Sequence, residues 1–359
     1  MDGSQGVEVQ LDGASLLAFC SNDYLDLAHH PAVIAAFKSG AERYGVGAGA
    51  SHLVSGHSRA HHALEEELAD FVGTARALLF STGYMANLGV AAALMDRHGT
   101  VFEDKLNHAS LIDAARLCGA RVKRYAHADM TQLTTRLTQT TGEKLMLTDG
   151  VFSMDGDIAP LPALCTLARA HQAWLLVDDA HGLGVLGTHG RGSFEHFGLA
   201  VETPVILMGT LGKAFGTFGA FVAGSEDIIE TLIQSARTYI YTTALPPAVA
   251  EATRASLKLV RTEPWRRELV RARIEQFQRG ARTLGLTLLD SNTPIQAVIL
   301  GEPELAVAAS HALRARGLLV PAIRPPTVAR NSARLRITFS AGHTRTHVDR
   351  LLDGLASLK

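Results

Sequence analysis

Residues 174–182 read WLLVDDAHG, and this stretch decides the fold class. Trp174 to Val177 form an unbroken apolar run, which is typical of a strand buried on both faces of a sheet. Two carboxylates, Asp178 and Asp179, follow the run directly. A buried acid at a strand end is costly unless a cation lies opposite it. The stretch therefore predicts a parallel sheet with a polar site at the carboxyl ends of its strands.

Other short apolar runs recur along the chain, at residues 77–80, 100–102, 145–147 and 205–208. Helical patterns alternate with them, such as the segment whose apolar face would be Leu64, Leu68, Phe71 and Val72. This alternation predicts an α/β protein with a mostly parallel sheet covered by helices.

The last third of the chain predicts a smaller α/β domain. Proline cannot continue a helix interior or a strand ladder, so Pro246-Pro247 marks the expected entry. We therefore expect an N-terminal segment at 1–35, a large domain at 36–242 and a small domain at 243–359. The elements expected in the small domain are helices at 246–261, 264–283 and 303–316 and strands at 295–300 and 334–339.

Composition excludes several classes of protein. The chain has 359 residues, 47% of them apolar, and 34 basic against 35 acidic residues give a net charge of −1. This composition argues against disorder, and the balanced charge gives no footprint for nucleic acid or an anionic membrane. Three widely spaced cysteines match neither a disulfide framework nor a zinc motif. Without a signal peptide or a spanning apolar run, a cytoplasmic protein is expected.

Residues 210–216, TLGKAFG, place Lys213 just beyond a predicted buried strand. In a low-dielectric setting its amine could lose its proton and attack a carbonyl. A surface lysine in a glycine-rich turn is the plainer alternative. The spacing argues against a nucleoside-triphosphate loop, because Ala214 stands where that motif needs Ser or Thr.

Three further groups are expected near that lysine. Asp178 could face a protonated pyridine nitrogen, with His181 beside a phenolic oxygen of the same ring, or the acids could only cap a loop. His108 precedes a predicted helix and could stack on an aromatic cofactor, or only contact the helix. Gly83 opens another helix, whose free N–H groups could hold a phosphate. Jointly these groups match the needs of pyridoxal 5′-phosphate (PLP).

With these residues identified, the chain resembles the α-oxoamine synthases, PLP enzymes of fold type I that condense an amino acid with an acyl-CoA. The likeness runs from Ser21 to about Leu352 and is carried by 55–58 (SGHS), 107–110 (NHAS), 150–156 (GVFSMDG), 178–182 (DDAHG) and 322–328 (AIRPPTV). It implies a seven-stranded, mostly parallel sheet in the large domain. Asp149 departs from the family, which usually has glutamate there.

The resemblance also implies roles for residues that bind the cofactor. Lys213 would hold PLP as a Schiff base and move the substrate proton. Asp178 would keep the ring nitrogen protonated, and His108 would stack on the ring, so these three are the expected catalytic residues. The other expected cofactor contacts are Gly83, Tyr84, Ser153, His181, Thr210 and, from a neighbouring subunit, Thr243.

For the substrate, the resemblance implies that Arg324 binds the amino-acid carboxylate, with Thr327, Asn22 and His108 also in contact. It favours L-alanine and a pimeloyl thioester, on CoA or a carrier protein, and a homodimer with shared active sites. A sibling that joins glycine to acetyl-CoA, a catalytically silent subunit and a generic nucleotide-binding module are the alternatives. No metal site is expected, because His57, His61 and His62 fit a helix face with no supporting cysteine or acidic cluster.

Overall fold

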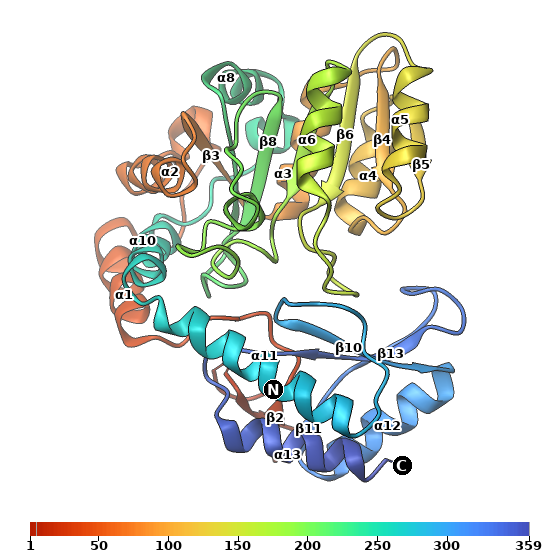
Figure 1. The fold of residues 1–359 in the computed structure, drawn as a ribbon. Helices are drawn as coiled ribbons and strands as arrows, with labels where there is room; N and C mark the ends of the chain where they lie inside the picture. The colour runs from red at the N-terminus through yellow and green to blue at the C-terminus, as the bar shows by residue number, and fades with distance from the viewer. Residues whose placement is uncertain (5, 359) are drawn as a thin grey trace. The chain divides into compact units, whose positions relative to one another are not determined.

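The computed structural model describes residues 1–4 and 6–358, which divide into two compact units (Figure 1). The large unit comprises Pro31–Phe152 and Ile158–Arg261. The small unit comprises Met1–His30, Ser153–Asp157 and Thr262–Lys359. The limits of these compact units differ from the domain limits that the sequence predicts, at residues 36 and 243. The domain limits themselves stay predictions. Pro246 and Pro247 lie within the large unit, where Pro247 begins helix α10 (Pro247–Thr262).

The large unit is built on a seven-stranded sheet, as the resemblance implied. Its strand order is β3-β9-β8-β7-β6-β4-β5, and only β9 runs antiparallel to its neighbours. The α/β class with a mostly parallel sheet is therefore confirmed. The strands are β3 (Arg76–Phe80), β4 (Thr100–Asp104), β5 (Arg121–Tyr125), β6 (Lys144–Asp149), β7 (Trp174–Asp178), β8 (Val205–Thr210) and β9 (Ala220–Gly224).

The apolar runs of the sequence form five of these strands, β3, β4, β6, β7 and β8. Two strands were not predicted. β5, RVKRY, is charged because it lies at the sheet edge, where most of its side chains are exposed or half-buried. β9, AFVAG, is a short apolar segment directly after the glycine-rich loop.

Helices cover the sheet of the large unit. One core cluster joins apolar side chains of α3, α4 and α8 to those of the central strands. α2, α5 and α6 pack on β3, β5 and β7, and Figure 1 shows α6 in front of the sheet. Besides α10, its helices are α1 (Pro31–Tyr44), α2 (Arg59–Val72), α3 (Gly83–Leu94), α4 (Ala109–Leu117), α5 (Met130–Thr138), α6 (Leu161–Ala170), α7 (Ser193–His196), α8 (Glu226–Ser235) and α9 (Arg237–Ile240), with a π-helical turn η1 (His52–Gly56).

The local sequence sets both ends of α2. Ser58 is the N-cap residue, and its backbone N–H and side chain contact Nδ1 of His61 in a capping box. Gly73 ends the helix in the left-handed conformation (φ 76°), which glycine adopts without steric cost. Between these ends, the predicted apolar face is buried.

The small unit holds two three-stranded sheets, ordered β1-β2-β11 and β10-β13-β12. Its core is aromatic at the centre, where the ring of Phe339 contacts those of Phe19 and Phe277. The strands are β1 (Glu8–Leu11), β2 (Ala14–Ala18), β10 (Ile295–Gly301), β11 (Leu318–Leu319), β12 (Ala322–Ile323) and β13 (Ala333–Thr338), and the helices are α11 (Trp265–Thr283), α12 (Pro303–Ala315) and α13 (Arg345–Ala356).

Throughout residues 1–4 and 6–358, no helix combines the length and the apolar character needed to cross a membrane.

Candidate active site

Lys213 and His181 meet at the carboxyl edge of the large sheet. Lys213 follows β8, and His181 lies three residues after the end of the adjacent parallel strand β7. The Lys213 Nζ atom is 2.7 Å from Nε2 of His181. Because parallel neighbours end at the same edge, the register of β7 and β8 brings the amine and the imidazole together.

Asp178, the last residue of β7, is held by hydrogen bonds from two sides. The Asn87 side-chain amide donates to Oδ2 at 2.8 Å, and the Ala180 N–H donates to Oδ1 at 3.1 Å. Asn87 is fully buried in α3, and its amide also donates to Oγ of Ser110 at 2.9 Å. The carboxylate therefore has a fixed orientation.

His108 is the N-cap residue of α4. Its Nδ1 accepts a hydrogen bond from the Ser110 N–H at 3.2 Å and lies 2.8 Å from Oγ of Ser110. Burial lowers the pKa of His108, although the charge of Asp178 opposes that effect. His108 thus makes the contact with the helix N-terminus that the sequence analysis gave as the alternative to a cofactor contact.

Asp149, the departure from the family pattern, accepts a hydrogen bond from the His108 N–H on Oδ2 at 2.7 Å. It ends β6 directly opposite Asp178 in the strand register. Burial, and next the nearby charge of Asp178, raise the pKa of Asp149 well above its ordinary value. Asp149 thus helps to place His108 at the site.

The N-terminus of α3 provides anion-binding groups. Thr82 caps the helix, and its Oγ1 accepts from the Met85 N–H at 3.2 Å. The N–H groups of Gly83 and Tyr84, in the first turn, lack acceptors within the helix. A Cβ atom at Gly83 would lie 3.2 Å from Cε of Met208. Glycine therefore leaves the space in front of the helix N-terminus open to a ligand.

These groups share one cavity. The predicted residues Gly83, Tyr84, His108, Asp178, His181, Thr210 and Lys213 all line it, together with Ser110, Asp149, Ala180 and Met208. Thr243 belongs to the same unit but not to the lining residues, and its carbonyl accepts from Oγ of Ser81 at 3.4 Å.

The other predicted residues, Ser153, Asn22, Arg324 and Thr327, belong to the small unit. There the Arg336 guanidinium donates to the carbonyl of Ser153 at 2.6 Å. Arg324 lines a hollow on α12, and its carbonyl accepts from the Thr327 N–H at 3.1 Å.

Sequence reasoning missed Asn87 and Ser110 as members of the site. A usable signal existed for Asn87, because it is the one amide in the otherwise apolar helical run Met85 to Leu94. Asp149 was noted only as an unusual residue, and its hydrogen bond to a backbone N–H has no sequence signal.

Comparison with known proteins then identifies the family. The model of the family "Aminotransferase class I and II" matches residues 14–355. An 8-amino-7-oxononanoate synthase of Thioalkalivibrio sulfidiphilus is 63% identical over 99% of this chain and 91% of its own length. One of Pseudomonas aeruginosa is 62% identical over 99% of this chain and 88% of its own.

The chain belongs to the α-oxoamine synthase family. Solved structures agree: a serine palmitoyltransferase of Sphingomonas wittichii has a TM-score of 0.94 at 33% identity, covering 98% of this chain and 89% of its own. The 8-amino-7-oxononanoate synthase of Francisella tularensis has a TM-score of 0.84 at 33% identity, covering 95% and 97%. As in these α-oxoamine synthases, the cofactor is PLP.

The residues of the cavity fit that cofactor. Lys213 offers an amine for the aldehyde, Asp178 an acid for the ring nitrogen, and α3 a helix N-terminus for the phosphate. The amide of Asn87 holds the acid on the side away from solvent, since it is itself fully buried.

Proposed function

We propose that this α-oxoamine synthase condenses L-alanine with a pimeloyl thioester, with loss of CO2, to form 8-amino-7-oxononanoate. The geometry that carries the proposal is the Lys213 amine 2.7 Å from His181 in the cavity that Asp178 also lines. The choice of substrates is supported by relatives of that name, 60–63% identical over essentially the whole chain.

The reaction balances in four changes. Cα of alanine loses a proton, and a C–C bond forms between Cα and the thioester carbonyl carbon. The thiol leaves with a proton, and the bond from Cα to the carboxylate breaks to release CO2. A proton then returns to Cα. Bound PLP supplies the electron sink that makes Cα acidic.

Residues of the chain direct those changes. Lys213 removes the proton from Cα and later returns one, and the neighbouring His181 orients the amine. Asp178, fixed by Asn87, keeps the heterocycle nitrogen protonated. His108 stacks on the ring, with Asp149 holding its backbone, and the N–H groups of Gly83 and Tyr84 bind the phosphate with Thr210.

In the small unit, Arg324 binds the alanine carboxylate with its planar guanidinium, while Asn22 and Thr327 contact substrate. Ser153 lies against the cofactor. Thr243 of a second copy reaches the phosphate, so that the working form is a homodimer. The cytoplasmic location stays a prediction.

The central experiment compares the wild type with Lys213→Ala. The purified wild type should be yellow, and borohydride should attach the cofactor covalently to Lys213, as peptide mass analysis would show. In the Lys213→Ala variant, both the attachment and turnover with L-alanine and pimeloyl-CoA should be lost, the latter by about 100-fold or more. Undiminished turnover would rule the mechanism out.

Substrate choice is tested separately. L-alanine with pimeloyl-CoA or pimeloyl carrier protein should give the highest kcat/KM. Glycine with acetyl-CoA and L-serine with palmitoyl-CoA are the matched controls. A preference for either control pair would reassign the activity within the family while leaving the cofactor site intact.

Shared active sites predict complementation. Lys213→Ala and Thr243→Asp subunits should each be inactive, but heterodimers of the two hold one site with both residues intact. Mixing them through mild denaturation should restore part of the activity. No restoration, with heterodimers shown by mass analysis, would place Thr243 in its own subunit's site or in none.

A further inference from the structure

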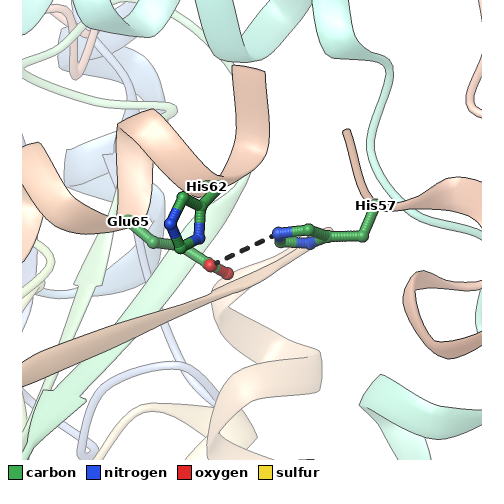
Figure 2. Close-up of side chains that lie close together, drawn as sticks. All are labelled: His57, His62 and Glu65. Atoms are coloured by element: carbon green, nitrogen blue, oxygen red, sulfur yellow. Dashed lines mark ion pairs between the residues drawn. The ribbon is translucent and has the colours of Figure 1, made fainter. Parts of the chain in front are cut away.

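Three side chains meet outside the active-site cavity: His57, His62 and Glu65 (Figure 2). His57 directly precedes Ser58, the N-cap residue of α2, while His62 and Glu65 are three residues apart on that helix and so share a face. One ligand atom from each lies within 4.8 Å of the other two. Two imidazoles and a carboxylate form a donor set that zinc accepts.

A backbone hydrogen bond orients the Glu65 carboxyl group. Its Oε1 accepts a hydrogen bond from the Leu79 N–H at 2.9 Å. Its Oε2 faces His57, 3.8 Å from Nε2, which is too far for a hydrogen bond. The carboxyl is largely buried, and burial raises its pKa to about 7. A cation between Oε2 and His57 would offset the cost of burying this charge.

His57 is also held through its second nitrogen. Nδ1 of His57 lies 3.0 Å from Nδ1 of His52, so one of them donates to the other. The His52 ring stacks on Tyr239 with centroids 4.8 Å apart, which fixes the partner. When His57 donates, its Nε2 carries the lone pair that a metal needs, and such outer partners are typical of histidine ligands.

His61 is not part of this group. Its Nδ1 faces Ser58 and its Nε2 lies 2.7 Å from the carbonyl of Leu245, so both ring nitrogens have partners. His62, by contrast, is two-thirds exposed: its Nε2 lies 3.3 Å from the exposed Glu66, and its ring lies edge-on to that of His57. Exposed pairs of this kind are weak, so His62 can turn toward Glu65 at little cost.

We propose that His57, His62 and Glu65 bind one divalent first-row metal ion, with Zn²⁺ as the reference ion. Bonds of about 2.0–2.2 Å in a tetrahedral site put ligand atoms about 3.4 Å apart, so the ligand atoms, now within 4.8 Å of one another, approach by up to about 1.4 Å. A water molecule takes the fourth position. The ion fastens the residue before the N-cap of α2 to the first turns of that helix. From the sequence we expect no metal here, because neither a cysteine nor an acidic cluster accompanies the histidines; in the structure the single acid Glu65 completes the donor set.

The test uses the PLP-loaded protein, dialysed against a chelator and then titrated with ZnCl2 by calorimetry, with bound zinc measured by elemental analysis. The wild type should bind one ion at this cluster. His62→Ala and Glu65→Gln should each weaken zinc binding by at least about 10–100-fold. Loss of a residue that only hydrogen-bonds a metal ligand already has an effect of this size. Co²⁺ in place of Zn²⁺ should give the absorption of a tetrahedral site.

Two matched controls separate this site from other zinc-binding groups. Glu66→Gln removes the negative charge that competes for His62 and should leave zinc affinity unchanged or increased. His29→Ala removes an exposed histidine of the small unit and should have no effect. His62→Ala lies at an exposed position, and Glu65→Gln keeps the acceptor for Leu79, so unaltered PLP absorbance and melting without metal are expected of both.

The proposal is overturned if the wild type takes up no zinc, or if His62→Ala and Glu65→Gln bind zinc as the wild type does. In the second outcome the ion would lie elsewhere, and the His57–Glu65 contact would be an ion pair only. Neither outcome affects the proposed enzymatic function, since no residue of the cluster lines the active-site cavity.

Discussion

The side-chain amide of Asn87 donates to Oδ2 of Asp178 at 2.8 Å, from a position with no exposed surface. The acid proposed to hold the charge of the cofactor ring is thus positioned by a helix that begins at the proposed phosphate site. The helix α3 therefore positions both the acid proposed for the ring nitrogen and the N–H groups proposed for the phosphate.

Asn87→Leu should weaken PLP binding and lower kcat/KM by about tenfold or more. The variant removes a hydrogen bond to a charged group, which is worth about 1.5–3 kcal/mol. PLP affinity can be measured by absorbance titration of the apoprotein. Thr148→Val is the matched control, because it removes a buried hydrogen bond, to the Asp149 carbonyl, from a residue that does not line the cavity; an equal loss in both variants would contradict a positioning role for Asn87.

Tyr84→Phe should leave PLP affinity within about twofold of the wild type. The Tyr84 hydroxyl donates to Asp113 on the exposed side of the helices, and an exposed hydrogen bond contributes little. The proposed phosphate contact is the backbone N–H, which this variant keeps.

Gly83→Val is the informative counterpart of Tyr84→Phe. It should reduce PLP affinity, because the two methyl groups of valine would take up space at the cavity that Gly83 and Met208 line. The same titration measures both variants. A large loss in Tyr84→Phe alone would show that the side chain, and not the main chain, contacts the cofactor.

Asp179 should make the protein less stable as the pH rises from 4 to 7. Burial raises its pKa to about 7, although Ser193 donates to both carboxyl oxygens. The folded state therefore favours the protonated acid, whose contribution is complete below the unfolded pKa of about 4 and is lost as pH rises through 7. The loss should reach a few kcal/mol, at about 1.4 kcal/mol per pKa unit.

Urea unfolding at pH 5 and pH 8 measures this dependence. Asp179→Asn should reduce it, because the amide carries no proton to lose, while Glu65 and Asp149, whose pKa values burial also raises, keep the remainder. A difference between the two pH values that is equal in wild type and variant would assign the pH dependence to other groups.

Asp155→Ala should destabilise the small unit by about 3 kcal/mol or more. Asp155 pairs with the Arg334 guanidinium, which is buried, and removing one partner leaves an uncompensated charge. Glu226→Ala, which breaks the exposed pair with Arg76, is the control and should cost less than about 1 kcal/mol. Urea unfolding compares the two, and equal costs would contradict the difference in burial.

The sequence predicted the large sheet well because its central strands are buried on both faces. Runs such as Leu175–Val177 contain no polar residue to obscure the pattern. The edge strand β5 escaped notice because three of its five side chains are basic, a composition that solvent contact permits. β9 was missed because the glycine-rich loop before it carries the chemistry and hides a short strand.

The site was predictable where function demands a special residue type. Lys213, Asp178 and His108 each lie at or just after the end of a buried strand, or at the start of a helix, where a polar side chain next to an apolar run indicates a functional role. Asn87 and Ser110 act through hydrogen bonds to such residues from other elements, and only the folded chain brings them together. The role of Asp149 lies in a backbone contact, which leaves no trace in the local sequence.

The parallel pairing of β2 with β11 joins Leu17 to Leu318. During synthesis, the first of these residues leaves the ribosome some 300 residues before its partner. At about 5–20 residues per second, the amino-terminal strand waits roughly 15–60 s with one edge unpaired. Translation speed and early chaperone contacts should therefore affect the yield of this enzyme more than they affect a chain whose first strand pairs with its near neighbours.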